Sequence, residues 1–396
     1  MHRALAPALA GLLTGVLALP GSAVADVGPD TWTVPTSARL TITGHGYGHG
    51  HGMSQYGAEG AARAGLTYQQ IAEFYYAGTT WAATRGRIRV QITGDTTPAD
   101  LVVRARPGLT LRDSAVPGRV ALPDNGATQW RVDAGAAGTT VSYLTDTWHP
   151  FSTLAGRGEF FAAGKPITLV TPAGERAYRG RLRTAVTTDG AAVTVNALGL
   201  ESYLRGVVPL EIPASWSLEA VRAQAVAART YAAYERAHPR ASAFQICDTT
   251  SCQVYGGYDA EHRVANEAIR ATRGQILTSG DGPAFTQFGS SNGGWSAAGS
   301  VPYLSAREDP YDGWTGNPVH TWTARLDDTV IEKRWPKLGE LTGIAVTGRD
   351  GNGEWGGRVR SLTLTGTGGT VVVSGDTLRS LLGLRSTWLT FQVEAR

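Results

Sequence analysis

The sequence predicts an α+β protein, made mainly of β-sheet around a central alanine-rich helix, with an additional small all-β unit. Three observations lead to this prediction. The run from Ser217 to Ala237 is rich in alanine and indicates one long helix. Short alternating runs separated by Gly, Pro and Asp turns fill the segment 87–148 and indicate strands. Further strand-like runs lie at 167–196 and 358–373.

The remaining elements follow from local signals along the chain. Ser54 and Thr67 are suitable N-caps for two short helices, the second of which ends at Gly78. Ser217 is the expected N-cap of the long helix, and Glu219 lies in its first turn, where the helix dipole favours a carboxylate. Other expected elements are a strand at 38–43, a helix at 259–272, a short helix at 376–382 and a last strand at 389–394.

Composition excludes several classes of protein. The chain has 396 residues, of which 42% are hydrophobic and 17% charged, which is enough apolar material for a packed core and excludes global disorder. Its 51 glycines follow no three-residue period, which excludes collagen. The net charge is only +3 and the basic residues form no run or stripe, so we expect no nucleic-acid partner.

The N-terminus has the pattern of a secretory signal peptide. A positive start is followed by the apolar run 4–19 and by Ala23-Val24-Ala25, which predicts cleavage after Ala25. The alternative is a retained membrane anchor, which Pro20 and Gly21 disfavour because they interrupt the apolar run early. We therefore expect a secreted protein, extracellular or associated with the cell wall, with no membrane contact after cleavage.

Two cysteines, Cys247 and Cys252, are close in sequence. In an exported protein this spacing favours a local disulfide. A zinc site is the alternative. It needs about four ligands, and no histidine lies inside or just beside the loop, although His238 and His262 could fold back towards it. We expect the disulfide and no metal.

Glu211 is a lone carboxylate in an apolar segment, 207–216, just ahead of the long helix. Burial among such residues disfavours the charged form of a carboxylate and raises its pKa. A carboxylic acid of this kind can donate a proton near neutral pH. The alternative is a structural carboxylate that accepts backbone N–H groups at the helix start. The physical argument alone leaves both interpretations open.

The segment around Glu211 resembles the SpoIID/LytB family. The residues that carry the resemblance are Tyr203-Leu204-Arg205-Gly206-Val207-Val208-Pro209-Leu210-Glu211-Ile212-Pro213, the helical block 219–232, Cys252-Gln253-Val254-Tyr255-Gly256-Gly257, 272–274 and 290–294. The resemblance extends from about residue 166 to the C-terminus. It implies a lytic transglycosylase that cleaves bacterial glycan strands at N-acetylmuramic acid, on strands stripped of peptide stems. The family's catalytic glutamate falls on Glu211.

A solitary carboxylate is compatible with that chemistry. Glycoside hydrolases ordinarily need two carboxylates. In a lytic transglycosylase Glu211 alone would protonate the glycosidic oxygen and then take the proton of the muramic acid C6 hydroxyl as it closes on C1. The product is a 1,6-anhydro sugar, no water is consumed, and no cofactor is expected.

The resemblance also suggests substrate contacts. Its basic residues fall on Arg222 and Arg229, which lie seven residues apart and therefore share a helix face. The alternative for this pair is a solvated arginine face. Weaker candidates for sugar contact are Gln224, Tyr231, Tyr255, Ser290 and Ser291. For the loop that contains the two serines, the alternative is an ordinary tight turn.

A glycine- and histidine-rich segment near the N-terminus belongs to the resemblance as well. Residues 48–58 and 75–79 look like the family's closing motif, which in known members follows the C-terminal strand. Here the motif comes first, as in a circular permutation or a displacement. We expect it to pack beside the Glu211 region and to bring His49, Ser54 and Gln55 to the cleft.

Three other interpretations of this segment remain. His49 and His51 could both face a metal from a strand, but a clear third ligand is lacking. A phosphate cradle lacks the surrounding βαβ unit. A purely structural glycine loop is the third. Some family members hold zinc near the position of Cys247 and Cys252, and the missing histidines favour the disulfide here.

These observations predict four parts: a signal peptide (1–25), a Gly/His segment packing on the catalytic domain (26–82), a small β unit (83–150) and a SpoIID-like catalytic domain (151–396). The expected function is an exported lytic transglycosylase whose partner is the peptidoglycan glycan strand. The alternative is a non-catalytic wall-binding protein that stimulates a separate amidase, so amidases or other wall hydrolases are further expected partners. A lysozyme-like hydrolase is a third option.

Overall fold

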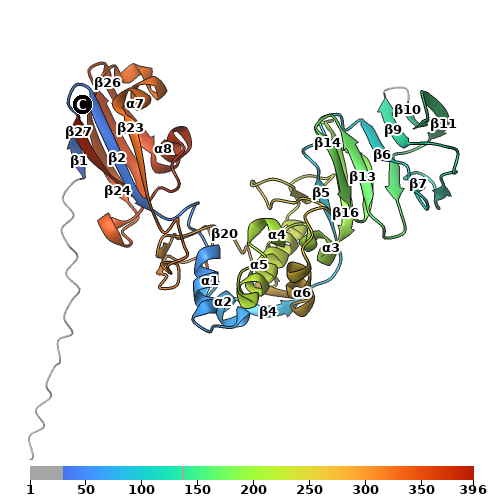
Figure 1. The fold of residues 1–396 in the computed structure, drawn as a ribbon, viewed down its shortest axis with the longest axis horizontal. Helices are drawn as coiled ribbons and strands as arrows, with labels where there is room; N and C mark the ends of the chain where they lie inside the picture. Colours follow the sequence, from blue (N-terminus) through green and yellow to red (C-terminus); the bar gives the residue numbers. More distant parts are fainter. Residues whose placement is uncertain (1–29, 136–137) are drawn as a thin grey trace, which may run out of the picture.

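A computed structural model describes residues 30–135 and 138–396. The predicted signal peptide, 1–25, lies outside the described residues. The predicted α+β class is confirmed: two β-rich lobes lie on either side of a helical centre (Figure 1). Within the described ranges, no helix is both long and apolar enough to cross a membrane.

The helical centre is built around α5 (Leu218–Ala237), the helix predicted from the alanine-rich run. Against it pack α1 (Gln55–Arg63), α2 (Tyr68–Tyr75) and α6 (Arg263–Ala271). Most alanines of α5 are buried, because small side chains let the neighbouring helices approach its backbone closely. The helix is thus central, as the sequence predicts.

Ser217 is the N-cap residue of α5, as predicted, although its hydroxyl makes no capping bond to the first turn. The buried carboxylate of Glu59 on α1 accepts the Ser217 N–H at 2.8 Å and its hydroxyl at 3.2 Å. A carboxylate at a helix N-terminus is favoured by the exposed N–H groups and the helix dipole. The Gly/His segment therefore contributes directly to the start of the central helix.

The β lobe lies on one side of this centre and contains two sheets. One has the order β11-β10-β9-β6-β13-β14 and the other β17-β5-β16-β15-β12-β7-β8. The strands are β5 (Arg87–Gln91), β6 (Asp100–Arg104), β7 (Thr110–Asp113), β8 (Val120–Ala121), β9 (Gln129–Gly135), β10 (Gly138–Leu144), β11 (Trp148–Leu154), β12 (Gly158–Phe161), β13 (Ile167–Thr171), β14 (Gly174–Tyr178), β15 (Arg181–Val186), β16 (Ala192–Gly199) and β17 (Ile246–Cys247).

The strands of this lobe pair across the boundary expected at residue 150. β6 pairs with β13, β7 with β12, and β5 with β16. Residues 83–150 therefore share both sheets with the strands that follow them, and one hydrophobic core joins this lobe to the helical centre.

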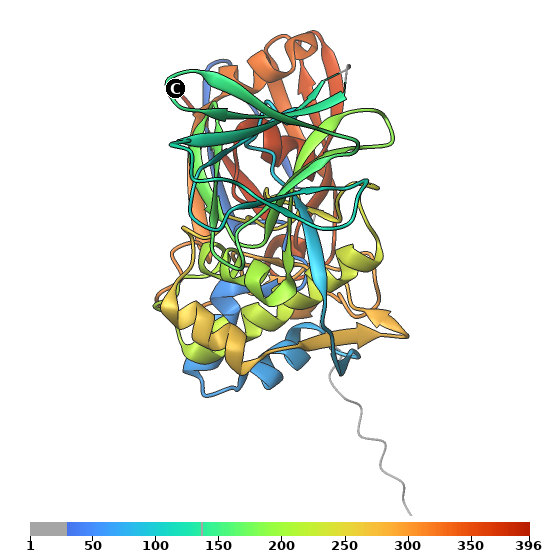
Figure 2. The same ribbon diagram turned by 90° about the vertical axis from the view of Figure 1, so that its right-hand side faces the viewer.

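The terminal lobe, on the other side of the centre, combines both ends of the described chain (Figure 1). Its sheets have the orders β1-β24-β25-β26 and β23-β2-β27. Its elements are β1 (Thr31–Thr33), β2 (Ala38–His45), β23 (Thr321–Asp327), α7 (Asp328–Arg334), β24 (Leu341–Arg349), β25 (Val359–Gly366), β26 (Gly369–Ser374), α8 (Gly375–Leu382) and β27 (Leu389–Ala395). It has a hydrophobic core of its own. In Figure 2 the two β-rich lobes lie one behind the other above the helices.

β2, near the start of the described chain, and β27, the last strand, are neighbours. Ala38 pairs with Ala395, and the Arg396 N–H bonds to the Ser37 carbonyl at 2.9 Å. Adjacent chain ends are what a circular permutation requires. The permutation itself stays a prediction.

The Gly/His segment joins the terminal lobe to the helical centre. β3 (Met53–Ser54) pairs in parallel with β20 (Phe288–Gly289), and isolated bridges join Tyr47 to Ser291 and His51 to Ala297. The remaining elements are α3 (Leu200–Arg205), α4 (Val208–Glu211), β4 (Thr80–Ala83), β18 (Gln275–Ser279), β19 (Gly282–Pro283), β21 (Trp295–Ser296), β22 (Arg307–Glu308) and two short 3-10 helices at 336–338 and 354–356.

Candidate active site

Glu211 lies at the end of α4, a single helical turn that begins with Val208-Pro209. Proline is favoured in a first helical turn because its missing N–H would have no partner there. Glu211 reaches a cavity of about 300 Å³. The residues that line this cavity are His49, Glu211, Tyr231, Thr250, Ser251, Cys252, Val254, Gln287 and Phe288.

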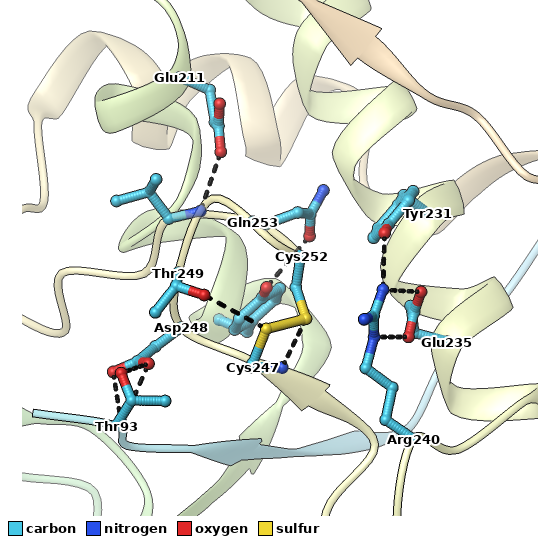
Figure 3. The surroundings of a disulfide bond; sticks show 12 residues. Thr93, Glu211, Tyr231, Glu235, Arg240, Cys247, Asp248, Thr249, Cys252 and Gln253 are labelled. Carbon is cyan, nitrogen blue, oxygen red and sulfur yellow. Dashed lines mark hydrogen bonds and ion pairs between the residues drawn. A yellow bond between two sulfur atoms is a disulfide. The ribbon is translucent and has the colours of Figure 1, made fainter. Parts of the chain in front are cut away.

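The Glu211 carboxyl has two polar neighbours. Its Oε1 accepts the backbone N–H of Val254 at 3.0 Å (Figure 3), and the Gln55 side chain favours its charged form. Burial raises the pKa of Glu211, and Val254 and Gln55 offset part of that rise. The net shift is upward, which keeps the acid protonated to higher pH.

A disulfide braces the loop that carries Val254. Cys247, at the end of β17, is bonded to Cys252 with an S–S distance of 2.07 Å (Figure 3). The Tyr255 N–H also bonds to the Asp248 carbonyl at 3.1 Å, closing the loop a second time. The N–H that meets Glu211 is thus supplied by a short cross-linked loop, two residues after Cys252.

Tyr231 reaches the cavity from α5. Its hydroxyl accepts a hydrogen bond from Arg240 at 3.2 Å, and Glu235 holds Arg240 with bonds of 2.7 and 3.0 Å (Figure 3). Burial raises the pKa of Tyr231 to about 12, so its hydroxyl stays neutral. Gln224 lies seven residues earlier, on the same helix face, and is fully buried. Within the described chain neither of its amide atoms has a hydrogen-bond partner.

Comparison with known proteins identifies this part of the chain. The family SpoIID, described as Stage II sporulation protein, matches residues 188–279, which include α4, α5 and the disulfide loop. This segment is therefore similar to the SpoIID family, in agreement with the resemblance seen in the sequence.

Three curated relatives are similar to the chain. An amidase enhancer of Bacillus subtilis (strain 168) is 39% identical over 156 residues, which cover 37% of this chain and 21% of the relative. Stage II sporulation protein D of the same organism is 28% identical over 221 residues, covering 49% and 60%. The protein of that name from Bacillus amyloliquefaciens is 28% identical over 222 residues, with the same coverage. The chain therefore spans less than two thirds of each of these relatives.

His49 joins the SpoIID segment at the cavity from the Gly/His segment. Its Nδ1 accepts the His51 N–H at 2.9 Å, and the two rings stack with centroids 5.0 Å apart. Desolvation, followed by the charges of His51, Arg379 and Arg358, lowers the pKa of His49, so the ring is neutral at neutral pH. With Nδ1 accepting, Nε2 carries the proton. Across the described ranges, no group of three or more His, Cys, Asp or Glu side chains is arranged to hold a metal ion.

Gln55 and Ser54 were both expected at the cleft, but their side chains have different roles in the structure. Gln55 acts on the Glu211 carboxyl and favours its charged form, as described above. Ser54 is buried; its hydroxyl caps α1 by accepting the Gly57 N–H at 2.9 Å and donates to Asp312 at 2.6 Å. Ser54 therefore stabilises the start of α1, and its hydrogen-bonding capacity is used within the protein.

Arg229 does not face the cavity of the SpoIID segment. Its side chain is completely buried and forms a two-pronged ion pair with Glu201, with both N–O distances at 2.9 Å. It also donates to the Ile269 carbonyl at 3.1 Å, which ties α5 to α6. Every one of these contacts is internal, so the expected substrate contact is corrected to a structural one.

Arg222 shares the face of Arg229, as predicted, but that face is turned away from Glu211. Nine residues separate Arg222 from Tyr231, which places them about half a turn apart around the helix. Arg222 instead pairs with Glu219, whose Oε2 accepts the Tyr68 N–H at 2.7 Å. The arginine therefore supports the carboxylate that caps α2.

Tyr255 and the serine loop are also structural. Tyr255 is 2% exposed and donates its hydroxyl proton to Asn196 at 2.8 Å. Ser291 is buried and bonded to Asp312 at 2.8 Å, and Asp312 also accepts the Asn292 and Gly293 N–H groups. These bonds occupy the loop's hydroxyl and N–H donors that were expected to bind sugar. Ser290 is only partly buried, but it does not line the cavity of Glu211.

The sequence interpretation missed several residues at the cavity. Thr250, Ser251, Gln287 and Phe288 line it, and the Val254 backbone holds Glu211. Thr250 and Ser251 could have been found, since they lie inside the cysteine loop of the SpoIID segment. Gln287 and Phe288 carry no motif; they reach the site because β20 pairs with β3 of the Gly/His segment.

Proposed function

We propose that the protein is an exported lytic transglycosylase that cleaves peptidoglycan glycan strands at N-acetylmuramic acid and leaves 1,6-anhydro ends. The observation that supports this most directly is Glu211. It is a carboxyl with a raised pKa in the lining of a cavity, and the described lining holds no second carboxylate. The match of residues 188–279 to the SpoIID family and the similarity to Stage II sporulation protein D support the same proposal.

The proposed reaction uses Glu211 twice. The protonated acid donates its proton to the glycosidic oxygen as the bond from that oxygen to C1 of muramic acid breaks. The carboxylate that results is stabilised by the Val254 N–H and by Gln55. It then accepts the proton of the C6 hydroxyl while that oxygen bonds to C1. The leaving sugar carries the first proton, and Glu211 ends as it began.

Two neutral groups would accompany Glu211 in the cavity. His49 and Tyr231 line the cavity and are the candidates for contact with sugar hydroxyls or the N-acetyl oxygen. Hydrolysis would need a second carboxylate to activate water or attack C1, at about 5–10 Å from the first. The lining of the cavity offers none. Intramolecular attack by the C6 hydroxyl is therefore favoured over attack by water.

The decisive experiment is product analysis on glycan strands freed of peptide stems. The wild type should release fragments with anhydro ends, which mass spectrometry separates from reducing ends by one water. Glu211→Gln should release none. The matched control is Glu267→Gln on α6, a glutamate whose side chain is 44% exposed, and this variant should cleave like the wild type. Release of reducing ends, or an active Glu211→Gln protein, would refute the proposal.

A second candidate function is stimulation of a separate amidase. It is supported by the relative named amidase enhancer, which is 39% identical over the matched region. Under this alternative the protein binds wall material and releases nothing. Glu211→Gln would then accelerate an added amidase as well as the wild type does. A difference between the two proteins in that assay favours the lytic function.

A further inference from the structure

One face of the seven-stranded sheet in the β lobe is dominated by arginine. Arg112 on β7 and Arg183 on β15 both pair with Glu159 on β12, and directly paired residues carry their side chains on the same face. Arg181 lies two residues before Arg183, on that face, and shares Ala197 as a strand partner with Arg89. The residues in between, such as Phe160 and Leu182, point to the core.

We call this surface the arginine face and define it by Arg89, Arg112, Arg157, Arg181, Arg183 and Glu159. Part of this face lines a cavity of about 370 Å³. Arg112, Arg157, Arg183 and Glu159 line that cavity together with Ser114, Ser242 and Ala243. Arg157 precedes β12 directly and is exposed.

The arginine face carries more positive charge than the neighbouring carboxylates of the described chain neutralise. Glu159 is its single carboxylate, with Arg181 Nη1 at 3.3 Å and Arg112 Nη1 at 3.9 Å from Oε1. In the part of the chain that the structure describes, no carboxylate lies within 4.0 Å of Arg89, Arg157 or Arg183. The buried Nε atoms of Arg89 and Arg183 have no hydrogen-bond partner there.

The neighbouring charges also act on Arg183. Burial lowers its pKa, and the charges of Arg89, Arg157 and Arg112 act in the same direction, while Glu159 opposes them. Like charges gathered at a cavity repel one another, and a bound anion relieves that repulsion. The cavity is therefore suited to a ligand that carries negative charge.

This cavity shares no lining residue with the one at Glu211, but the chain connects them. Arg240, which donates to Tyr231 in the Glu211 cavity, lies just ahead of Ser242 and Ala243. The same loop packs through Ala243 and Phe244 on Val193 and Val195 of the sheet.

We propose that the arginine face binds the free carboxylates of a stripped glycan strand. The choice of polymer rests on the proposed function. An intact peptide stem is joined to the lactyl group of muramic acid by a neutral amide, and removal of the stem leaves a carboxylate on each such sugar. Guanidinium groups bind carboxylates through two parallel hydrogen bonds. The cavity volume lies within the usual range for sites that hold a small molecule, such as one sugar with its acidic substituent.

The test measures binding in a Glu211→Gln background, so that strands stay intact. One probe is stripped strands with free lactyl carboxylates. The matched probe is the same preparation after carbodiimide coupling to methylamine, which neutralises the carboxylates. We expect the charged strands to bind about tenfold more tightly than the neutral ones, because charge-assisted bonds are lost on amidation. The difference should shrink as salt is added.

Arg157→Gln/Arg183→Gln should reduce affinity for the charged strands about tenfold and leave affinity for the neutral strands unchanged. Arg176→Gln on β14, an exposed arginine outside the arginine face, is the control. If the double variant fails to fold, Arg157→Gln alone provides the test, because Arg157 is exposed and makes no ion pair within the described ranges.

Equal binding of charged and neutral strands, or charged-strand binding unaffected by the arginine substitutions, would overturn the proposal. So would arginine-dependent binding of a glycerol phosphate polymer without binding of stripped glycan. These outcomes do not depend on cleavage. A protein that releases no anhydro ends but shows arginine-dependent binding would refute the proposed function and support this inference.

Discussion

Glu211 and Val254 are joined by a hydrogen bond of 3.0 Å from the Val254 N–H to Glu211 Oε1. It links the turn before α5 to the disulfide loop after it, so the carboxyl is held by backbone on one side. Oε1 can accept this bond whether the carboxyl is protonated or ionised. The other oxygen, Oε2, is then free to carry the proton. The arrangement fits a group that must alternate between acid and base in one reaction.

The Gln55 side chain should tune the acidity of Glu211. Its amide favours the carboxylate and lowers the pKa of Glu211, against the larger effect of burial. Gln55→Met removes the donor at similar size, so the pKa of Glu211 should rise further. Because the protonated form starts the reaction, cleavage should persist to higher pH than in the wild type. The pH dependence of cleavage measures this.

The exposed residue Gln392 on β27 provides the matched control, since Gln392→Met should leave the pH profile unchanged. A profile of Gln55→Met that moves to lower pH, or does not move, would contradict the assigned role of Gln55.

The disulfide should stabilise both the fold and the site. Closing the loop between Cys247 and Cys252 restricts the unfolded chain, which is worth about 2 kcal/mol for a loop of this size. Cys247→Ser/Cys252→Ser should lower the free energy of unfolding by about that amount and should also lower the rate of cleavage, because Val254 loses its support. Chemical denaturation and product release measure the two effects.

Reduction of the wild-type disulfide should reproduce the double substitution, and the reductant should leave the Cys247→Ser/Cys252→Ser protein unaffected. Full cleavage activity after confirmed reduction would show that the loop does not need the cross-link to present Val254.

The elements that the sequence predicted well are those with local signals. The alanine-rich run gave α5, and Ser54 and Thr67 cap α1 and α2 as expected, the second with a complete capping box. Each of these signals acts within a few residues of the chain. Ser217 is the N-cap of α5 as predicted, but its contact with the Glu59 carboxylate could not be predicted, because Glu59 is 158 residues away.

Side-chain roles were harder to predict than elements. Arg229 and Ser291 have the chemistry of sugar-binding groups, but Glu201 and Asp312 use that chemistry inside the protein. The helical period predicts which residues share a face, but it does not predict which groups that face contacts in the folded protein. Likewise, alternating runs predicted the strands of the β lobe but not that they pair across residue 150.

Arg229 should prove to be a structural residue. Arg229→Ala leaves the Glu201 carboxylate without its buried partner and opens space between α5 and α6. We expect a loss of about 3 kcal/mol in the free energy of unfolding. Arg222→Ala on the same helix removes a half-exposed ion pair and should cost at most about 1 kcal/mol.

At a temperature where both variants are folded, neither should change the KM for glycan strands by much, since neither arginine lines the cavity of Glu211. A large rise in KM for Arg229→Ala with unchanged stability would restore the substrate-binding interpretation.

Asp309 should make the free energy of unfolding fall as pH rises, because its pKa is raised in the folded protein. Its carboxyl is 3% exposed and accepts bonds from Tyr75 at 2.7 Å and Asn292 at 2.7 Å. Burial, with the nearby charge of Asp312, raises its pKa to about 6 despite those bonds. In the unfolded chain an aspartate has a pKa of about 3.9. The folded protein therefore holds a proton that the unfolded chain releases between about pH 4 and about pH 6.

Because the folded state binds the extra proton, the contribution of Asp309 to stability is full below about pH 4 and is lost as pH rises through about 6. Asp309→Asn has no such titration, so the free energy of unfolding of the wild type should fall relative to the variant as pH rises from 4 to 7. Guanidinium unfolding of both proteins at several pH values in this window measures the difference. A difference that stays constant across the window would mean that Asp309 is already ionised in the folded protein at pH 4.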